Sequence, residues 1–255
     1  NNGWISETYN VSRGIRQGCP CSSLIFTIAV EILACRIRQD TGIKGFQIKL
    51  DSKTHSLKIS QLADDTTLFL KCKQEISYAL NLIEIFGTLS GLKLNRSKTE
   101  GIWLGQLKSC KDKYENINWN KEPIKSLGVY FGLNKDECDR LNTERILRKS
   151  QDAINSWNRR NLTMIGKITV IKSLILPNLT FLASVTTISK NFLNEFKTLI
   201  YNFIWGNKKE KVKRITLCKD YLEGGLKMIN IDNFLSAIQL SWVKRLTSTH
   251  FANWK

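Results

Sequence analysis

Apolar residues recur with a helical period in four parts of the chain, and each part predicts an amphipathic helix. The first helix is expected to place on one face Ile25, Ile28, Ala29, Ile32 and Leu33, with its start capped by Ser22 and Ser23. The second repeats the pattern at Ile76, Ala79, Leu80, Ile83 and Phe86, and Gly91 follows as a C-terminal cap. The later two contain Phe192, Phe196, Leu199 and Phe203, and then Ile231, Phe234, Leu235, Ile238 and Trp242.

Alternating polar and apolar residues predict strands between the first two helices. Residues 46–50 and 57–59 alternate in this way across a polar turn at 51–55. Leu62-Ala63 and residues 67–70 flank Asp64-Asp65, which predicts a tight hairpin with two carboxylates at its tip. Short strands are also predicted at 102–104 and 124–131. From Asp136 onward the pattern is helical, so the fold class is expected to be α+β, followed by a mostly α-helical part, with a boundary near Asn134.

Composition adds a strong charge imbalance to this picture. Hydrophobic residues make up 42% of the 255 residues and charged residues 24%, which permits a sizeable core and excludes a wholly disordered chain. Lys and Arg number 39 against 22 Asp and Glu, and the net charge of +17 indicates a polyanionic partner or an anionic membrane surface.

The longest apolar run, residues 24–30, is interrupted by Thr27 and is far shorter than the ~20 residues that span a bilayer, so a soluble chain without a membrane partner is expected. Seven cysteines include no Cys-x-x-Cys pair. A zinc cluster is therefore not predicted, and reduced thiols in an intracellular protein, nuclear or cytoplasmic, are expected.

The adjacent carboxylates of Asp64 and Asp65 suggest a metal site. Like charges side by side raise each other's pKa, and a half-buried position makes ionisation costlier still. A divalent cation removes that conflict, and Mg²⁺ is held by one or two carboxylates together with substrate phosphates. Neighbouring strand residues face opposite ways, so Asp64 is expected to be the primary ligand. The alternative is a polar hairpin tip without a metal, because Asp favours turns.

Three further segments surround this pair in sequence order. Residues 13–20, Arg-Gly-Ile-Arg-Gln-Gly-Cys-Pro, form a loop whose glycines let backbone approach a ligand before a helix N-terminus, which attracts phosphate. Residues 90–100, Ser-Gly-Leu-Lys-Leu-Asn-Arg-Ser-Lys-Thr-Glu, place three basic residues in one loop. Residues 125–130, Lys-Ser-Leu-Gly-Val-Tyr, form a strand-like segment with a glycine.

In this order and at these intervals, the segments resemble the palm of reverse transcriptases, specifically those of non-LTR (LINE-type) retrotransposons. The resemblance continues at Trp157 and at residues 164–177, 203–206 and 224–226, and so covers nearly the whole chain. It implies a partial reverse transcriptase palm over 1–133, an antiparallel sheet with packed helices, and a helical thumb or connection region over 134–255. It also implies RNA-directed DNA synthesis with an RNA template, a DNA primer, dNTP substrates and two Mg²⁺ ions.

The resemblance also assigns roles to individual residues. Asp64, with Asp65 beside it, is expected to ligate the catalytic metals, and Lys98 is expected to act as a general acid near the leaving pyrophosphate. Without the resemblance, Lys98 is an ordinary solvated lysine. The incoming nucleotide and the template base are expected to lie against Arg16, Gln17 and Gly18. A primer-gripping hairpin at the palm edge is expected from Leu127 to Tyr130, and the primer grip itself is expected to comprise Leu127, Gly128 and Val129.

The sequence also departs from the family pattern. In this family another metal-binding aspartate ends a strand well before the Gln-Gly motif, but Glu7 is the sole acid before Gln17 here. Two-metal chemistry uses carboxylates from separate segments, so we expect the chain to be a piece of something longer that lacks most activity by itself. Cys21 and Ser23 stand where the family usually has Leu and Pro, which is one sign of a decayed copy.

Basic residues crowd two stretches of the second half. From the first stretch, which also contains Arg140, phosphate contacts are expected from Arg145, Arg148, Lys149, Arg159 and Arg160. The second stretch contains Lys208, Lys209, Lys211, Lys213 and Arg214. The alternative for either is a solvated helix face. Three tryptophans at helical core spacing are expected to pack rather than to stack on bases: Trp157, Trp205 and Trp242.

Two other functions stay open on the sequence alone. The first is a catalytically dead, basic nucleic-acid-binding remnant that holds a duplex without extending it. The second is a polymerase similar to group II intron maturases, which share the palm but fit less well after residue 134. Protein partners are not indicated by any motif.

Overall fold

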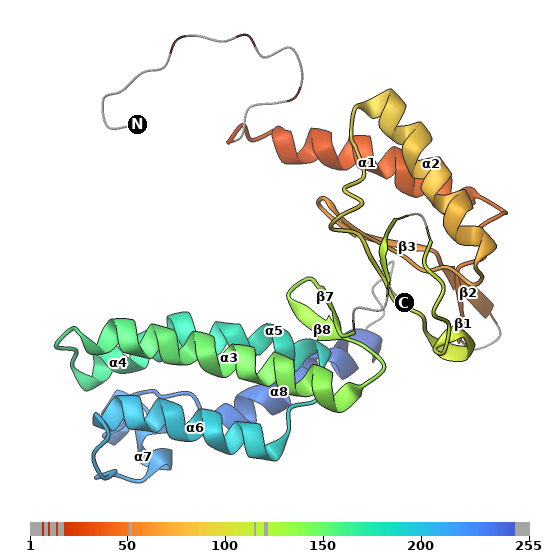
Figure 1. The fold of residues 1–255 in the computed structure, drawn as a ribbon. Coiled ribbons are helices and arrows are strands. Elements are labelled where there is room, and N and C mark those ends of the chain that lie inside the picture. Colours follow the sequence, from red (N-terminus) through yellow and green to blue (C-terminus); the bar gives the residue numbers. More distant parts are fainter. Residues whose placement is uncertain are drawn as a thin grey trace. The chain divides into compact units, whose positions relative to one another are not determined.

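The chain forms two compact units, Asn1–Lys121 and Glu122–Lys255. The structure, a computed structural model, describes residues 7, 10, 14, 18–50, 53–114, 116–119 and 122–247 (Figure 1). The first unit contains, in chain order, α1 (Ser22–Gln39), β1 (Phe46–Leu50), β2 (Lys53–Leu57), β3 (Ile59–Leu62), β4 (Asp65–Leu68), α2 (Gln74–Ser90), β5 (Glu100–Gly101), the 3₁₀ turn η1 (Gly105–Leu107) and β6 (Asn118–Trp119).

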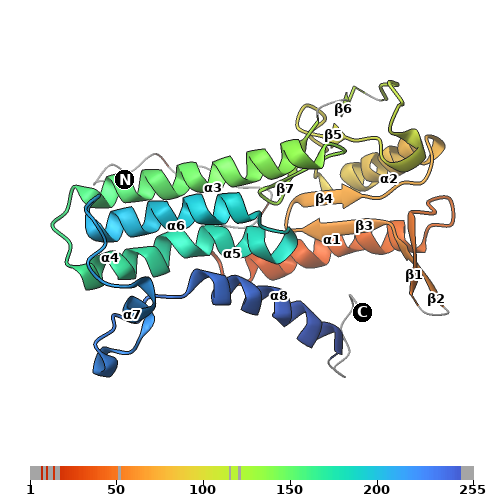
Figure 2. The same cartoon turned by 90° about the horizontal axis from the view of Figure 1, so that it is seen from below.

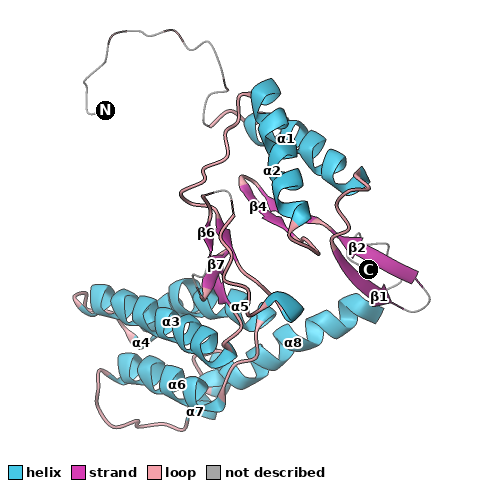
Figure 3. Ribbon diagram, turned by 45° about the vertical axis from the view of Figure 1, so that its right-hand side comes forward, coloured by secondary structure: helices cyan, strands magenta, loops and turns pink. Residues whose placement is uncertain are grey.

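The second unit is predominantly helical (Figure 3). It contains β7 (Ile124–Ser126), β8 (Val129–Phe131), α3 (Lys135–Asn158), α4 (Met164–Val170), the π-helical turn η2 (Ile171–Ile175), α5 (Leu176–Val185), α6 (Lys190–Trp205), α7 (Arg214–Cys218), the 3₁₀ turn η3 (Tyr221–Glu223) and α8 (Ile231–Thr247). The predicted order, α+β followed by mostly α, is confirmed. The expected division near residue 134 would place β7 and β8 in the first part of the chain, whereas the compact units divide between Lys121 and Glu122.

The strands form separate pairs. In the described residues, β1–β2, β3–β4 and β7–β8 are antiparallel hairpins, and β5–β6 is a short parallel pair. The strand pattern at 124–131 is divided into the two strands of the β7–β8 hairpin, because Leu127 and Gly128 both adopt positive φ and turn the chain; a hairpin at 127–130 is what the family resemblance implied. The strand predicted at 102–104 is wrong, since β5 ends at Gly101.

The helices α1 and α2 pack together in the first unit, but the buried face of α1 differs from the predicted one. Its buried residues are Leu33, Ala34 and Ile37, which join a core that includes Ile43, Ile59, Ala79 and Leu82. The predicted face is exposed at Ile25, Ile28 and Ile32, because only the C-terminal half of α1 contributes to this core. The predicted serine caps are also wrong: Cys21 is the N-cap residue, and Ser22 already lies within the helix.

The predictions for α2 are confirmed for its buried residues and for its C-terminal cap. Ile76, Ala79 and Leu80 are buried, and Gly91 adopts a left-handed conformation with a φ of 77° while its N–H bonds to the Gly87 carbonyl. A left-handed residue is a common way to satisfy the last carbonyls of a helix, and glycine adopts it without steric cost.

A buried carboxylate joins the end of α1 to α2. The Asp40 side chain is only 4% exposed and accepts hydrogen bonds from the Gly42 N–H at 2.8 Å and the Tyr78 hydroxyl at 3.0 Å. Burial alone would raise the pKa of Asp40, but these hydrogen bonds and the Arg36 guanidinium, 3.3 Å away, outweigh it and hold the pKa below its usual value. Lys58 donates to the Asp40 and Arg38 carbonyls and attaches β3 to the same point.

Three long helical segments form the core of the second unit: α3, the continuous helix α4–η2–α5, and α6 (Figure 2). The fully buried side chains at its centre include Ile171, Ile175, Leu179, Phe196 and Ile200. The predicted core positions Phe192, Phe196 and Phe203 of α6 are all buried. The helix α8 packs against α5 and contributes Ile231 and Leu235.

The helix Met164–Val185 is long and apolar enough to cross a membrane by length and composition alone. Much of its apolar surface is used within the unit, where Ile168, Ile171, Leu179 and Leu182 are buried in the core. Pro177 lacks an N–H for the helical ladder, and the adjacent η2 turn and the Asn178 side chain, which donates to the Leu174 carbonyl at 2.7 Å, accommodate the irregular hydrogen bonding.

The Asp40 carboxylate provides a test of the first unit. Because its pKa is lowered in the fold, it stabilises the protein above its unfolded pKa of about 3.9, and this contribution is lost as the pH falls through the folded pKa. We expect Asp40→Asn to lower the free energy of unfolding at pH 7 by about 1–3 kcal/mol. Urea denaturation followed by tryptophan fluorescence measures this difference, which should shrink below pH 4. The exposed Asp152→Asn should change stability by less than about 0.5 kcal/mol at either pH, and a pH-independent loss in Asp40→Asn would contradict the assignment.

Candidate functional site

The predicted carboxylate hairpin is formed by β3 and β4. Leu62 pairs with Asp65, so Ala63 and Asp64 make the two-residue turn, and Ala63 has a φ of 51°. The two carboxylates therefore lie at the tip, as predicted, with Asp64 in the turn and Asp65 at the start of β4. The argument from strand alternation does not apply to this pair, because only Asp65 belongs to a strand.

The tip of this hairpin is exposed to solvent rather than half-buried. Ala63, Asp64, Asp65 and Thr66 are all exposed, so burial does not penalise the charges as the sequence argument assumed. Within the described ranges, no group of three or more His, Cys, Asp or Glu side chains is arranged to hold a metal ion. Two carboxylates match the oxygen ligands of Mg²⁺ when substrate phosphates complete its shell. The two carboxylates therefore suit an Mg²⁺ ion whose other ligands are phosphate oxygens better than an ion bound by protein side chains alone.

Lys98 lies in a turn between α2 and β5 whose backbone is fixed by Asn95. The Asn95 carbonyl accepts from the Lys98 N–H at 3.1 Å and from the Thr99 hydroxyl at 2.8 Å, and Asn118 donates to the Ser97 carbonyl at 2.8 Å. The Lys98 side chain is exposed. In the described part of the chain, no hydrogen bond or ion pair links it to Asp64 or Asp65, so the three residues do not form a preassembled cluster.

Of the predicted nucleotide-binding loop, Arg16 and Gln17 lie outside the described residues. Gly18 has a φ of 90°, a conformation that favours glycine, and a β-carbon there would meet no atom within 4 Å. The backbone conformation, rather than a steric contact, therefore accounts for glycine at this position.

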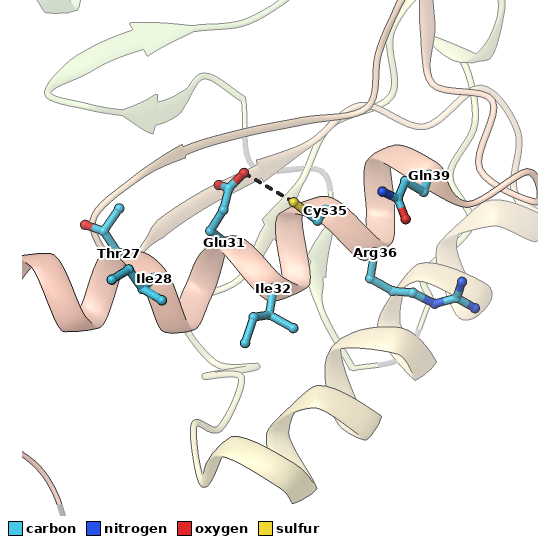
Figure 4. Close-up of a pocket in the computed structure, with 7 residues that line it drawn as sticks. All are labelled: Thr27, Ile28, Glu31, Ile32, Cys35, Arg36 and Gln39. Carbon is cyan, nitrogen blue, oxygen red and sulfur yellow. Dashed lines mark hydrogen bonds between the residues drawn. The ribbon is translucent and has the colours of Figure 1, made fainter.

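A shallow hollow on the first unit lies along one face of α1 (Figure 4). Its lining comprises Thr27, Ile28, Glu31, Ile32, Cys35, Arg36 and Gln39. Glu31 accepts a hydrogen bond from the Cys35 thiol and forms an ion pair with Arg38 at 2.6 Å. None of the residues predicted to be catalytic lines this hollow, so it is separate from the carboxylate hairpin.

The predicted primer grip is the turn and second strand of the β7–β8 hairpin. Ser126 pairs with Val129, and Leu127 and Gly128 form the turn with φ values of 48° and 83°. Val129 is buried in the core of the second unit. Leu127 is 46% exposed.

Sequence analysis missed the residue that holds this hairpin on α3. Asn142 is only 1% exposed, accepts from the Tyr130 N–H at 2.9 Å and donates to the Tyr130 carbonyl at 3.0 Å. Asn142 lies four residues after Cys138 and four before Ile146, so all three share one helical face. This spacing was the available sequence signal that the face buries a side-chain amide.

The predicted phosphate-binding residues differ in their surroundings. Arg148, Lys149 and Arg159 are exposed, and among the described residues no hydrogen bond or ion pair engages their side chains. Arg160 lies over the Trp157 ring at 4.4 Å. Arg145 is partly buried and its Nε is without a hydrogen-bond partner. Two exposed cations of α3, Arg148 and Lys149, and Arg159 at its C-cap thus have no bonding partner within the described residues, and Arg145 has an unmet donor.

Other basic residues of the two stretches are neutralised within the protein. Arg140 pairs with Glu137 and Glu144, both at 2.7 Å, and these carboxylates raise the pKa of its guanidinium. Arg214 pairs with Glu210 at 2.5 Å and lies over the Tyr201 ring. Exposed lysines remain in the second stretch at positions 208, 209, 211 and 213.

The three tryptophans pack or bond within the second unit. Trp157 and Trp205 pack against the hydrophobic core, as predicted. Trp242 is 37% exposed, but its indole N–H donates to the Ser184 carbonyl at 2.8 Å, which attaches α8 to α5.

Comparison with known proteins identifies the family. The model of the family described as reverse transcriptase (RNA-dependent DNA polymerase) matches residues 1–131, slightly more than half of the chain. The chain is 24% identical over 200 residues, 77% of its length, to the transposon TX1 uncharacterized 149 kDa protein of Xenopus laevis. It is 28% identical over 96 residues, 38% of its length, to the retrovirus-related Pol polyprotein from type-2 retrotransposable element R2DM of Drosophila melanogaster.

The aligned regions make up 15% and 8% of these two relatives, so the chain spans a small part of their length. The family match ends at Phe131, the last residue of β8, and includes both the carboxylate hairpin and the β7–β8 hairpin. The resemblance inferred from the motifs is confirmed: the chain belongs to the reverse transcriptase (RNA-dependent DNA polymerase) family, with relatives among non-LTR retrotransposon proteins.

Proposed function

We propose that this chain supplies the carboxylate hairpin and part of the nucleic-acid-binding surface of an RNA-directed DNA polymerase of a non-LTR retrotransposon. The observation that carries the proposal is the position of Asp64 and Asp65 at the exposed tip of a hairpin within the family-matched residues. In the reaction, a primer 3′-hydroxyl attacks the α-phosphate of a dNTP opposite an RNA template, and pyrophosphate leaves.

Asp64 and Asp65 would hold Mg²⁺, with two ions in the intact site. When bound, Mg²⁺ supplies charge that stabilises the attacking and leaving oxygens of an in-line displacement. The exposed position of the carboxylates leaves room for nucleotide phosphates beside them. A further acidic side chain from another segment would be needed for two ions, since the described residues bring no third carboxylate to this pair.

Other residues would bind the substrates and move a proton. The Lys98 ammonium would donate a proton to the departing pyrophosphate, and its exposed side chain on a fixed turn is compatible with that role. Arg16, Gln17 and Gly18 would lie against the incoming nucleotide and the template base.

The primer and the duplex behind it would be held by the second unit, in the role of a thumb. Leu127, Gly128 and Val129 would grip the primer. Backbone phosphates would be bound by Arg145, Arg148, Lys149, Arg159 and Arg160. Such contacts supply affinity without sequence information.

A second candidate function is duplex binding without extension. It is favoured by the combination of exposed cations on α3 with a carboxylate pair that lacks a third acidic neighbour among the described residues. Both functions share the phosphate contacts and differ only in nucleotidyl transfer.

Primer extension on an RNA template separates the two candidates. We expect any extension by the chain to require Mg²⁺ and to fall by about 100-fold or more in Asp64→Asn, the scale of losing one group that stabilises a transition state. Asp152→Asn, an exposed substitution on α3, serves as the matched control and should retain the activity. Extension that survives Asp64→Asn would refute the carboxylate assignment, and duplex binding without extension would favour the second candidate.

The salt dependence of duplex binding tests the phosphate contacts. Each cation that neutralises a phosphate releases counterions, so we expect Arg148→Gln and Arg159→Gln each to reduce the slope of log K against log salt by about 1. Arg140→Gln should change the slope much less, because Arg140 is paired with Glu137 and Glu144. Fluorescence anisotropy with a labelled RNA–DNA duplex provides the measurement. Equal slopes for all three variants would contradict the proposed contacts.

A further inference from the structure

A lysine-rich segment, residues 208–213, joins α6 to α7 (Figure 3). Only Glu210 and Val212 interrupt its basic residues, which are Lys208, Lys209, Lys211 and Lys213. All four lysines are exposed, and among the described residues no hydrogen bond or ion pair engages their side chains. The segment also lies well beyond residue 131, where the match to the reverse transcriptase family ends.

Both ends of the lysine-rich segment are attached to α6. Gly206 closes this helix with a φ of 61°, and the Lys208 N–H donates to the carbonyl of the last helical residue at 3.3 Å. Just after the segment, the Arg214 guanidinium pairs with Glu210 and lies 4.1 Å from the centre of the Tyr201 ring. The fold therefore presents the lysines from a fixed base.

The backbone between these attachments is not used by the fold. Within the residues that the structure describes, no backbone hydrogen bond involves positions 209–212, and none of these positions belongs to a helix or a strand. Exposed main-chain groups of this kind can pair with those of a partner, which is how proteins bind extended peptides in a groove.

The arrangement of side chains favours a protein groove over a nucleic acid. Arg214 has the side chain best suited to bidentate phosphate contacts, but it is engaged by Glu210. Glu210 also places a carboxylate in the middle of the segment, and Val212, which is 41% exposed, adds an apolar side chain. A phosphate backbone is repelled by a carboxylate and gains nothing from a valine.

A groove that binds an extended chain avoids this conflict. Successive side chains of an extended chain point to opposite sides, so Lys209, Lys211 and Lys213 would face one way while Glu210 and Val212 face the other. Such a groove reads alternate side chains, and it would contact the lysines without contacting the carboxylate.

We propose that the lysine-rich segment is the recognition site for a nuclear import receptor, a protein whose acidic groove binds short peptides rich in lysine and arginine. Carboxylates of the groove pair with the lysine ammonium groups, and its apolar surface covers the aliphatic lysine stems. The inference goes beyond the proposed function, because it concerns the entry of the chain into the nucleus and needs no nucleotidyl transfer.

The first test measures receptor binding by fluorescence anisotropy of the labelled full chain. The segment variant combines Lys208→Gln, Lys209→Gln, Lys211→Gln and Lys213→Gln. We expect it to bind a purified nuclear import receptor about 30-fold more weakly or worse, since several charge-assisted contacts are removed together. A failure of the unmodified chain to bind the receptor, or equal binding by the segment variant, would overturn the inference.

A scattered variant provides the matched control. It has the same net charge as the segment variant but loses four exposed lysines elsewhere in the second unit, through Lys135→Gln, Lys190→Gln, Lys219→Gln and Lys244→Gln. It should bind the receptor within about threefold of wild type, because distant exposed charges are largely screened. Thermal unfolding checks that each protein is folded, and the double variant Lys209→Gln/Lys211→Gln replaces the segment variant if that variant unfolds.

The second test follows the chain in animal cells. The full chain is fused to several fluorescent proteins in tandem, so that the fusion is too large to diffuse through nuclear pores. We expect wild type and the scattered variant to accumulate in the nucleus and the segment variant to stay in the cytoplasm. The same distribution for all three proteins, inside the nucleus or outside it, would overturn the inference.

Duplex binding separates this inference from a nucleic-acid contact and from the proposed function. We expect the segment variant and the scattered variant to bind a labelled RNA–DNA duplex equally well, because both lose four positive charges. A selective loss of duplex affinity in the segment variant, with receptor binding unchanged, would assign the segment to nucleic acid and overturn the inference. Receptor binding by a chain that binds no duplex would leave the inference in place and contradict the proposed function.

Discussion

The two hydrogen bonds between the Asn142 amide and the Tyr130 backbone are the interaction on which the placement of the β7–β8 hairpin on α3 depends. They satisfy a polar side chain that is 1% exposed and an edge-strand N–H and carbonyl at the same time. Losing the amide would leave these backbone groups unsatisfied where burial makes that costly. Val129, next to Tyr130, is buried in the hydrophobic core, and Arg145 lies three residues after Asn142 on α3. The same pair of hydrogen bonds therefore holds the hairpin on the core and near the Arg145 guanidinium.

Charge in this protein is divided between groups paired internally and groups that are exposed to solvent. Arg140, Arg214 and Arg38 form close ion pairs with glutamates, while the exposed Arg148 and Lys149 of α3 have no such pairing among the described residues. The carboxylates of the β3–β4 hairpin are likewise exposed. Charges that remain solvated add little to folding stability, so their arrangement is free to serve binding to phosphates and to cations.

The order of the motifs was enough to recognise the reverse transcriptase family, and much local structure followed from short-range patterns. The α2 helix and its Gly91 cap were predictable because helical periodicity and a left-handed glycine act within a few residues. The hairpin that carries Asp64 was predictable for the same reason. The buried face of α1 was not, since apolar residues occur on more than one side of that helix and only packing against α2 selects Leu33, Ala34 and Ile37.

The sequence by itself therefore determined the family, the succession of an α+β part and a helical part, and the positions of the carboxylates and basic residues along the chain. Only the tertiary structure decided that Asn142 turns inward to Tyr130 and that the Nε of Arg145 is buried without a partner. The physical reason is the range of the interactions. Preferences for turns, helix caps and hydrophobic periodicity arise between residues that are close in the sequence. Burial and the satisfaction of hydrogen-bonding groups depend on residues that only folding brings together.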